Sequence, residues 1–410
     1  MDRGLDQWHD YQWHVENRIV DSRERFLATM AFEEVDRVPL WEFGYWAGAV
    51  RRWYGEGLQR KVGFPDSVPY GLSVRGEGNP WSEERDFGHD IHDVFGFDKG
   101  IRRIPLNNYV CPVFPVEVLE DHGDWVLMRD EDGILCRENK DRSSLPHGVG
   151  WPVANRDDWE RFKAERLQPT LEGRLPANWP QLVEQFKRRD YPLCVGGLHA
   201  GFFGTPRNLL GPENVLMAFY DQPELLHDMM DYLADFWIAI YGAVLDQVDA
   251  DLALIWEDMA YKAGPLISPA LFREFMLRPY QRLTSCLKEK GVKVILVDTD
   301  GDCWKLIPLF LEAGVTGLSP FEVNAGMDVV EVRKAFPRLQ MLGGLDKTKI
   351  AAGKEAIDAE LEAKVPFMLR HGGYIPHVDH NVPPDVSWDN FAYYRRRLGR
   401  MIVEGGQGRA

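Results

Sequence analysis

The sequence predicts an α/β fold, namely a (β/α)8 TIM-type barrel with an antiparallel β insertion in its N-terminal third. Short apolar runs alternate with amphipathic segments along most of the chain, a pattern typical of βαβ units in a parallel sheet. Acids or histidines follow most of these runs, as they do at the C-terminal face of barrels. No Gly-x-Gly-x-x-Gly motif follows the first run, which disfavours an open dinucleotide-binding sheet.

Each element is predicted from its periodicity. In residues 225–248 apolar side chains recur every three or four positions, which is one face of a helix. The next segment, DLALIWEDM at 251–259, is an almost continuous apolar run that ends in acids, as in a strand buried on both faces. By the same reasoning we expect strands at 38–43, 191–200, 292–300, 315–320, 339–344 and 373–379, and helices at 269–290, 304–312, 328–336 and 354–371.

Residues 107–150 interrupt the alternation. Within them, segments 113–121, 125–130 and 134–139 have the character of antiparallel strands, and the Asp-Gly pair at 132–133 is a strong hairpin signal. We interpret 107–150 as a β-meander inserted into a single barrel domain that spans 1–410. The sequence leaves open whether this insertion is a surface ornament or a lid over the substrate.

Composition excludes several classes of function. The formal net charge of −16 and the pI near 5.2 mean that the protein repels phosphate backbones and anionic lipids, so neither nucleic acid nor a membrane is expected as a partner. The N-terminal segment lacks the pattern of a secretory signal, and four aspartates interrupt the apolar segment 225–248. The cysteines are scattered and form no Cys-x-x-Cys pair, which fits a reduced, cytoplasmic protein; they are Cys111, Cys136, Cys194, Cys286 and Cys303.

Several motifs resemble the uroporphyrinogen decarboxylase superfamily. Residues 22–44, SRERFLATMAFEEVDRVPLWEFG, are similar to its opening helix, its Val-Asp-Arg-Val-Pro turn and its first strand. The similarity resumes at 204–224, GTPRNLLGPENVLMAFYDQPE, and continues from 256 to the end. Its most specific matches are GGLDKTKIAAGKEAI (343–357) and GGYIPHVDHNVPPDVSWDNFAYY (372–394). The resemblance covers about two thirds of the chain and implies a barrel enzyme.

Within this superfamily, the corrinoid-linked methyltransferase branch is favoured over the true decarboxylases. The decarboxylases clamp the carboxylates of their substrate with an arginine-rich N-terminal signature, whereas the corresponding GYWAGAVRRWYGEG contains only Arg51 and Arg52. The methyltransferases bind zinc through a His-x-Cys pair and a distal Cys. Here Asp298 and Asp300 occupy the positions of the pair and His380 falls near the distal Cys. The missing thiolates leave both the metal and the methylation of a thiol open.

Asp298 and Asp300 are the central catalytic candidates. Residues i and i+2 of a strand point to the same side, so both side chains should project into the barrel mouth. Two carboxylates there need a metal, a shared proton or a histidine such as His380. Asp298, Asp300 and His380 would suit a divalent metal such as zinc. The alternative is that one aspartate caps the following helix.

Further candidates lie at other strand ends. Of the adjacent acids Glu257 and Asp258 only one can face the mouth, and the resemblance favours Glu257 as the catalytic one, with an ion pair to Lys262 or Arg273 as the alternative. The last strand supplies two histidines suited to proton exchange, His377 and His380. Substrate-binding candidates, several of which could instead only pack or cap, are Glu42, His199, Arg207, Asp346 and Asp379. The arginines at 395–397 are expected at the solvated end of the last helix.

The leading hypothesis is a corrinoid-dependent methyltransferase or O-demethylase. It would move a methyl group from a small methylated (methoxy) substrate to a corrinoid carried by a partner protein, while the acids or a metal assist the leaving oxygen. One alternative is a decarboxylase or lyase that uses the same acids and histidines. Another is a tetrapyrrole- or corrinoid-binding module without catalysis, which the clustered acids disfavour because their burial costs free energy.

Overall fold

The computed structural model describes residues 20–65, 68–75, 89–141 and 146–407. The α-helices are α1 (Ser22–Met30), α2 (Ala47–Glu56), α3 (His89–Phe95), α4 (Arg156–Arg166), α5 (Trp179–Phe186), α6 (Gly204–Leu210), α7 (Pro212–Asp221), α8 (Pro223–Leu245), α9 (Pro269–Leu271), α10 (Leu277–Glu289), α11 (Ile307–Glu312), α12 (Val329–Ala335), α13 (Lys347–Ala352), α14 (Lys354–His371) and α15 (Trp388–Gln407). A π-helical turn (Phe272–Met276) joins α9 to α10, and 3-10 turns lie at Trp304–Leu306 and Val323–Ala325.

The strands are β1 (Tyr45–Trp46), β2 (Ser73–Val74), β3 (Arg102–Arg103), β4 (Glu117–Asp121), β5 (Trp125–Arg129), β6 (Leu135–Asn139), β7 (His147–Gly150), β8 (Leu193–Gly197), β9 (Leu252–Trp256), β10 (Ala260–Tyr261), β11 (Gly264–Pro265), β12 (Val294–Asp298), β13 (Gly317–Ser319), β14 (Gln340–Leu342) and β15 (Tyr374–Ile375).

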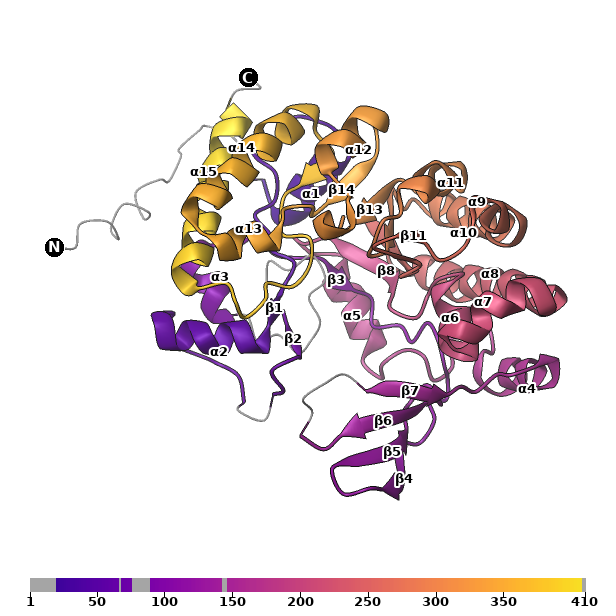
Figure 1. Cartoon of the computed structure of the whole chain (residues 1–410). Coiled ribbons are helices and arrows are strands. Elements are labelled where there is room, and N and C mark those ends of the chain that lie inside the picture. Colours follow the sequence, from indigo (N-terminus) through magenta and orange to yellow (C-terminus); the bar gives the residue numbers. More distant parts are fainter. Residues whose placement is uncertain (1–19, 66–67, 76–88, 142–145, 408–410) are drawn as a thin grey trace.

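A seven-stranded parallel sheet forms the centre of the fold, with the order β15-β14-β13-β12-β9-β8-β3 (Figure 1). β9 and β12 pair along their whole length, from Leu252 beside Val294 to Trp256 beside Asp298. Because the strands are parallel, their carboxyl ends meet at one edge of the curled sheet. The predicted α/β class and TIM-type barrel are therefore confirmed, and the strands expected from residue 191 onward are present with shorter bounds.

The predicted strand at 38–43 is wrong, because this segment is irregular. It nevertheless lies between the two end strands of the sheet. Leu40 O accepts a hydrogen bond from Asp98 N (3.2 Å) on the side of β3. On the side of β15, a side chain takes the place of a backbone acceptor, because Glu42 Oε1 accepts the N–H of Val378 at 3.0 Å. The barrel is thus closed by an irregular segment rather than by an eighth regular strand.

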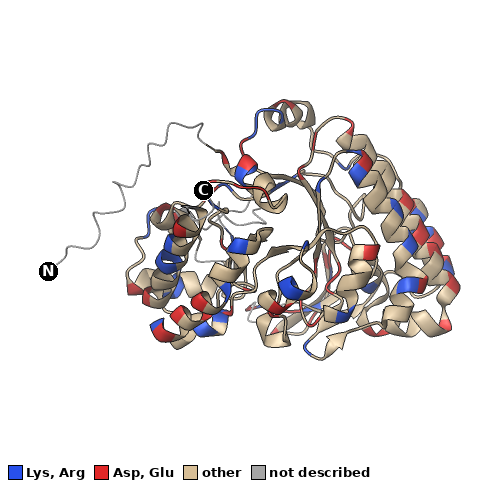
Figure 2. Cartoon of the chain, turned by 90° about the horizontal axis from the view of Figure 1, so that it is seen from above, with Lys and Arg blue, Asp and Glu red and all other residues tan. Residues whose placement is uncertain are grey.

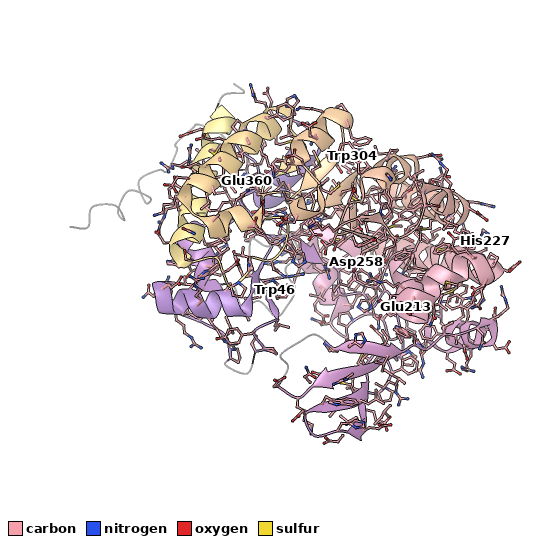
Figure 3. All side chains as sticks on the ribbon, viewed as in Figure 1. Trp46, Glu213, His227, Asp258, Trp304 and Glu360 are labelled. Carbon is pink, nitrogen blue, oxygen red and sulfur yellow. The ribbon has the colours of Figure 1, made fainter. Side chains whose placement is uncertain are left out.

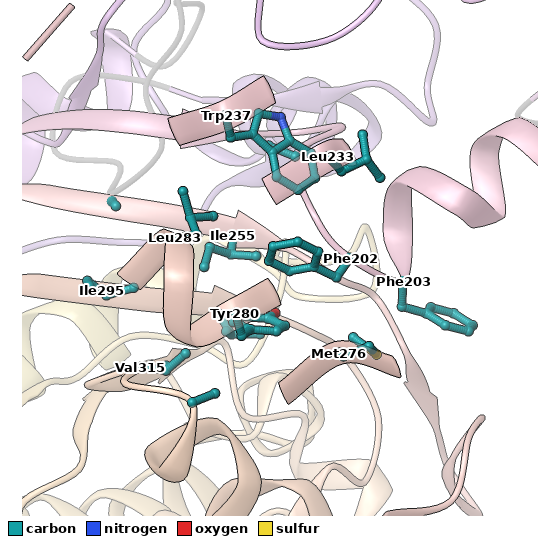
Figure 4. Close-up of a cluster of buried hydrophobic side chains, with 14 of the residues drawn as sticks. Phe202, Phe203, Leu233, Trp237, Ile255, Met276, Tyr280, Leu283, Ile295 and Val315 are labelled. Carbon is teal, nitrogen blue, oxygen red and sulfur yellow. The ribbon is translucent and has the colours of Figure 1, made fainter. Parts of the chain in front are cut away.

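Helices cover the outer face of the sheet, and their charged residues colour the outward turns in Figure 2. The amphipathic helix predicted at 225–248 is α8, which packs on α10. Between these helices and the sheet, the Phe202 ring lies 5.2 Å from Trp237 and 4.7 Å from Tyr280 (Figure 4). Fully burying an apolar side chain of this size stabilises the fold by roughly 1.5–3 kcal/mol, so this layer holds the strand ends in place.

The predicted antiparallel insertion is present, but it has four strands rather than three, in the order β4-β5-β6-β7. The periodicity missed β7 because its sequence, His-Gly-Val-Gly, contains two glycines and shows no apolar alternation. The turn expected from the Asp-Gly pair joins β5 to β6, and Gly133 has a φ of 87°, which glycine adopts without strain.

Two other features bear on the expected class of protein. All five cysteines are free, and three of them are buried: Cys136, Cys194 and Cys303. Among the described residues, we find no helix with the length and apolar character needed to cross a membrane.

Candidate active site

Three carboxyl groups meet at the carboxyl ends of two neighbouring strands. Asp298 is the last residue of β12, and Asp300 follows two positions later. Asp258 follows β9 with a φ of 45°, and its N–H donates to the carbonyl of Asp298 at 3.2 Å. Figure 3 labels Asp258 near the middle of the molecule, together with Trp46 from β1. The prediction that Asp298 and Asp300 lie together at the barrel mouth agrees with this arrangement.

The environment of Asp298 favours its neutral form more than water does. Burial raises the pKa of Asp298 to about 6, and the negative charge of Asp258 acts in the same direction. The positive charges of Arg75 and Arg103 oppose this shift. The Asp298 carboxyl therefore changes its charge close to neutral pH.

Asp300 is shifted further. Burial, followed by the charges of Asp298, Asp258 and Glu322, raises the pKa of Asp300 to about 8, and Lys347 opposes the shift. The Asp300 side chain is 39% exposed, so solvent screens part of the repulsion. Near neutral pH, Asp300 is a protonated carboxyl group that can donate a proton.

His380 lies next to Asp300, with its Nε2 at 3.9 Å from Asp300 Oδ2. Burial lowers the pKa of His380 to about 4, and the charge of Lys347 acts in the same direction. The imidazole packs near the rings of Phe43 and Trp46, at centroid distances of 5.0 and 5.9 Å. His380 is therefore neutral near pH 7, and it forms an aromatic wall of the mouth together with these rings.

Glu257 does not face the mouth, so its expected orientation is wrong. Its carboxylate is fully buried at the start of α6, where the backbone N–H groups of Phe202, Phe203 and Gly204 donate to it at 2.6 to 3.0 Å. The Tyr280 hydroxyl donates to it as well. Burial raises the pKa of Glu257, and these hydrogen bonds oppose the shift. All of these donors belong to the protein, so Glu257 holds a helix N-terminus in place, while the neighbouring aspartate points to the mouth.

The last strand supplies one buried histidine and one buried acid. His377 is completely buried, and its Nδ1 donates to the carbonyl of Val378 at 2.7 Å. Burial lowers the pKa of His377 to about 4, so it is a neutral group below the mouth. Asp379 is also fully buried and accepts hydrogen bonds from Val323 N and Lys347 Nζ, both at 3.0 Å. Asp379 therefore fixes the lysine that faces Asp300.

Two predicted substrate-binding acids have structural partners instead. Glu42 Oε2 accepts a hydrogen bond from Arg395 Nη1 at 3.0 Å, and both side chains are 1% exposed. The prediction that Arg395 is solvated was therefore wrong, because this buried acid draws it to the inner face of α15. Asp346 caps α13, since its Oδ1 accepts the N–H of Thr348 at 2.8 Å. Capping was the alternative that the sequence allowed for Asp346.

Arg207 and His199 do reach the edge of the mouth. Arg207 Nη1 donates to the carbonyl oxygen of Asp258 at 2.7 Å and to its Oδ2 at 2.8 Å. The Arg207 guanidinium also lies 4.9 Å from the centre of the Trp256 ring. His199 follows β8, and the centre of its ring lies 5.9 Å from the centre of the Trp256 ring. Arg207 thus fixes the position of Asp258 and keeps its carboxylate paired.

The predicted metal ligands do not form a metal centre. In the described part of the chain, no three His, Cys, Asp or Glu side chains are grouped closely enough to hold a metal ion. Because the side chains of Asp298, Asp300 and His380 are not grouped closely enough to hold an ion, we assign no catalytic step to a metal.

Asp258 and Lys347 are the mouth residues that the sequence reasoning missed. For Asp258 the signal was present, because two acids in succession must point in different directions. The family resemblance favoured Glu257, and neither it nor strand alternation predicts the left-handed backbone at Asp258. For Lys347 the only signal was its place directly after the capping residue Asp346.

Comparison with known protein families adds independent evidence. The family described as "Uroporphyrinogen decarboxylase (URO-D)" matches residues 152–398, which is more than half of the chain. The chain belongs to the URO-D family. The resemblance drawn from the sequence motifs is therefore confirmed.

Relatives with two different activities are found. A methylated-thiol–coenzyme M methyltransferase of Methanosarcina mazei is 29% identical over 182 residues, which cover 44% of this chain and 46% of that protein. A uroporphyrinogen decarboxylase of Alcanivorax borkumensis is 26% identical over 176 residues, which cover 41% of this chain and 46% of that protein. The chain thus matches about half the length of these curated relatives.

A solved structure has the same fold over nearly the whole chain. A methyltransferase from Methanosarcina mazei superimposes with a TM-score of 0.58, at 17% identity, and the match covers 93% of this chain and 99% of that one. At this identity the likeness concerns the fold alone.

Proposed function

We propose that this protein is a methyltransferase that takes a methyl group from a small methylated compound, such as a methyl ether, and transfers it to a corrinoid acceptor on a partner protein. The observation that carries the proposal is the position of the Asp300 carboxyl at the barrel mouth, 3.9 Å from His380 and beside other acids. The pKa of Asp300 is raised to about 8 by burial and by the surrounding acids Asp298, Asp258 and Glu322. A general acid works best when its pKa lies close to the working pH.

For a methyl ether, the bond between the methyl carbon and the oxygen breaks, and its electron pair stays on the oxygen. A free alkoxide or phenolate is a poor leaving group, so this oxygen needs a proton as the bond breaks. Asp300 donates that proton and becomes a carboxylate beside Asp298. Because the pKa of Asp300 is near 8, the carboxylate takes a proton back from solvent after the product leaves. A reduced corrinoid brought by the partner would supply the cobalt nucleophile that receives the methyl group.

The surroundings of Asp300 suit an apolar methyl group next to a polar oxygen. The neutral imidazole of His380 lies 3.9 Å from the Asp300 carboxyl. Phe43 and Trp46 flank the imidazole and offer apolar surface to the methyl group. Arg207 pairs with the side chain of Asp258, and the negative charge of Asp258 raises the pKa of Asp300.

A macrocycle that carries many carboxylates fits this mouth poorly. Arg51 donates to the carbonyl of Val68 and lies 4.9 Å from the Tyr70 ring, while Arg52 pairs with Glu56 at 2.6 Å. Both arginines near the predicted clamp position are therefore engaged by the protein itself. The likeness to a methyltransferase of Methanosarcina mazei also favours methyl transfer over the decarboxylation of uroporphyrinogen.

The test is a methyl-transfer assay with the purified full chain and cob(I)alamin. 2-Methoxyphenol, methoxyacetate and dimethyl sulfide are offered as donors, and methylcobalamin is followed by absorbance while products are separated by chromatography. We expect methylcobalamin and the demethylated product to form in equal amounts from at least one donor, and Asp300→Asn to slow transfer by about 10²–10⁴-fold. Release of carbon dioxide from carboxylated substrates without methyl transfer would favour the decarboxylase alternative. Cobalamin binding without turnover would favour the non-catalytic module.

A further inference from the structure

The tip of the antiparallel sheet contacts the barrel mouth. Its β5–β6 turn carries Asp132, whose Oδ2 lies 3.1 Å from Nδ1 of His199. His199 follows β8 of the central sheet, so this contact joins the insertion to the carboxyl edge of the barrel. The Asp132 side chain is only 16% exposed, although it lies at the end of a hairpin. The turn is therefore docked on the barrel rather than free in solvent.

The hairpin turn is built to present Asp132. The carboxylate of Asp130 accepts the N–H groups of Asp132 at 3.1 Å and of Ile134 at 2.8 Å. Gly133, between them, has a φ of 87°. These bonds fix the turn locally and leave the Asp132 carboxylate pointing away from its own hairpin, toward the barrel.

His199 is held in a conformation that side chains rarely adopt. Its φ is 68°, in the left-handed region, where a non-glycine residue is strained. The Thr205 hydroxyl donates to the His199 carbonyl at 2.5 Å and helps to hold this backbone. Glycine would accept the same backbone without strain, so the imidazole at this position contributes something that offsets the cost.

The same cluster is continuous with the proposed active site. The His199 ring lies 5.1 Å from the Tyr109 ring and 5.9 Å from the Trp256 ring. The Arg207 guanidinium lies over the Trp256 ring. Arg207 also donates a hydrogen bond to the carboxylate of Asp258 at the mouth. Trp256 and Arg207 therefore link this second polar cluster to the carboxylate of Asp258 at the mouth.

Two buried polar atoms in the cluster lack a hydrogen bond among the described residues. Tyr109 is 4% exposed, and its hydroxyl makes no hydrogen bond among the described residues. Nδ1 of His199 is also without a hydrogen bond of good geometry, although it lies close to Asp132. Buried polar groups are rarely left unpaired unless they serve a ligand or a solvent molecule.

We propose that the tip of the antiparallel sheet is the specificity-determining wall of the substrate site. Tyr109 and His199 contact the part of the substrate remote from the transferred methyl group, and Asp132 is a positioning residue that acts through His199. The ligand that fits is a small methylated compound with a nearby hydroxyl, because a hydroxyl accepts a hydrogen bond from Tyr109 and donates one to His199. The inference rests on the proposed function in taking the ligand to be a methylated compound.

The test measures binding and amide hydrogen exchange of the full chain with a matched pair of probes. 2-Methoxyphenol carries the hydroxyl, and 1,2-dimethoxybenzene replaces it by a second methoxy group. In the wild type we expect 2-methoxyphenol to bind at least fivefold more tightly and to slow exchange of the amides at 130–134. The proposal is overturned if 2-methoxyphenol does not slow exchange at these amides. It is also overturned if the two probes bind with equal affinity.

The variants separate a specific wall from a passive contact. We expect Asp132→Ala and His199→Asn to abolish the preference for 2-methoxyphenol, and asparagine at 199 tolerates the left-handed backbone. The control is Asp124→Ala, an exposed acid in the β4–β5 turn of the same sheet, which should bind both probes as the wild type does. Preference retained in both Asp132→Ala and His199→Asn contradicts the proposal.

Methyl transfer is assayed separately with each protein. Selective binding without any transfer rejects the proposed function and leaves this inference standing. Transfer with unselective binding rejects this inference and leaves the proposed function standing.

Discussion

Replacing Asp300 with asparagine should flatten part of the pH dependence of stability. Asparagine keeps the size of the side chain and cannot ionise. The folded-state pKa of Asp300, about 8, lies above its ordinary value of 3.8. Such a raised pKa contributes stability that is fully present below the unfolded pKa and is lost as the pH rises through the folded pKa. The wild type should therefore lose stability between about pH 4 and pH 8 that Asp300→Asn does not lose.

The expected magnitude is modest. A shift of about four pKa units would correspond to about 5 kcal/mol for a group shielded from solvent. Because the Asp300 side chain is 39% exposed, screening reduces this to about 1–2 kcal/mol. In a protein of 410 residues, that energy moves the melting temperature by about 1–2 °C. Asp300→Asn should melt at the temperature of the wild type near pH 4, and about 1–2 °C higher at pH 8.5.

The assay is thermal unfolding followed by circular dichroism from pH 4 to pH 9. The matched control is Asp302→Asn on the same loop. Asp302 Oδ1 accepts the N–H of Trp304 at 3.0 Å, and asparagine can accept the same bond. We expect Asp302→Asn to follow the wild type at every pH. If the melting temperature of Asp300→Asn also equals that of the wild type at every pH, the pKa of Asp300 is not raised and the reasoning is refuted.

Three further outcomes are expected. Asp258→Asn removes a charge that raises the pKa of Asp300, so the pH above which methyl transfer declines should fall by about one unit; an unchanged pH–rate profile would contradict the coupling. Glu257→Gln places an amide N–H group against the backbone donors of α6 and should destabilise the fold by about 2–3 kcal/mol, seen as a lower melting temperature, and an unaltered value would reject the capping role. The purified protein should not decarboxylate uroporphyrinogen, as judged by chromatography of the porphyrins, because Arg51 and Arg52 are engaged elsewhere; turnover at ordinary enzymatic rates would disprove this.

Much of the barrel follows from periodicity alone. The helix predicted at 354–371 has those bounds in the structure, and the helix predicted at 269–290 corresponds to the continuous segment 269–289. These elements are amphipathic or buried along their whole length, so the pattern of apolar residues determines them. The segment 38–43 has an equally apolar sequence. There, however, the Glu42 carboxylate accepts a backbone N–H that would otherwise pair with a strand, and the pattern of apolar residues does not predict this substitution.

The site was only partly predictable. Spacing by two residues was enough to bring Asp298 and Asp300 to one face, because that rule depends on strand geometry alone. The choice between Glu257 and Asp258 failed because it depends on a left-handed residue and on the donors that α6 offers. The docking of Asp132 on His199 involves residues far apart in the chain, and contacts of that kind have no local signal.

The central claim is that Asp300 carries a proton at neutral pH in the folded protein. Its most direct test is carbon-13 NMR of the aspartate carboxyl groups titrated from pH 3 to pH 10, with the Asp300 signal assigned by its loss in Asp300→Asn. The account predicts a midpoint well above the ordinary value, near pH 8, that moves downward in Asp258→Asn. A midpoint near pH 4 in the wild type, unmoved by Asp258→Asn, would contradict the assignment of Asp300 as the proton donor.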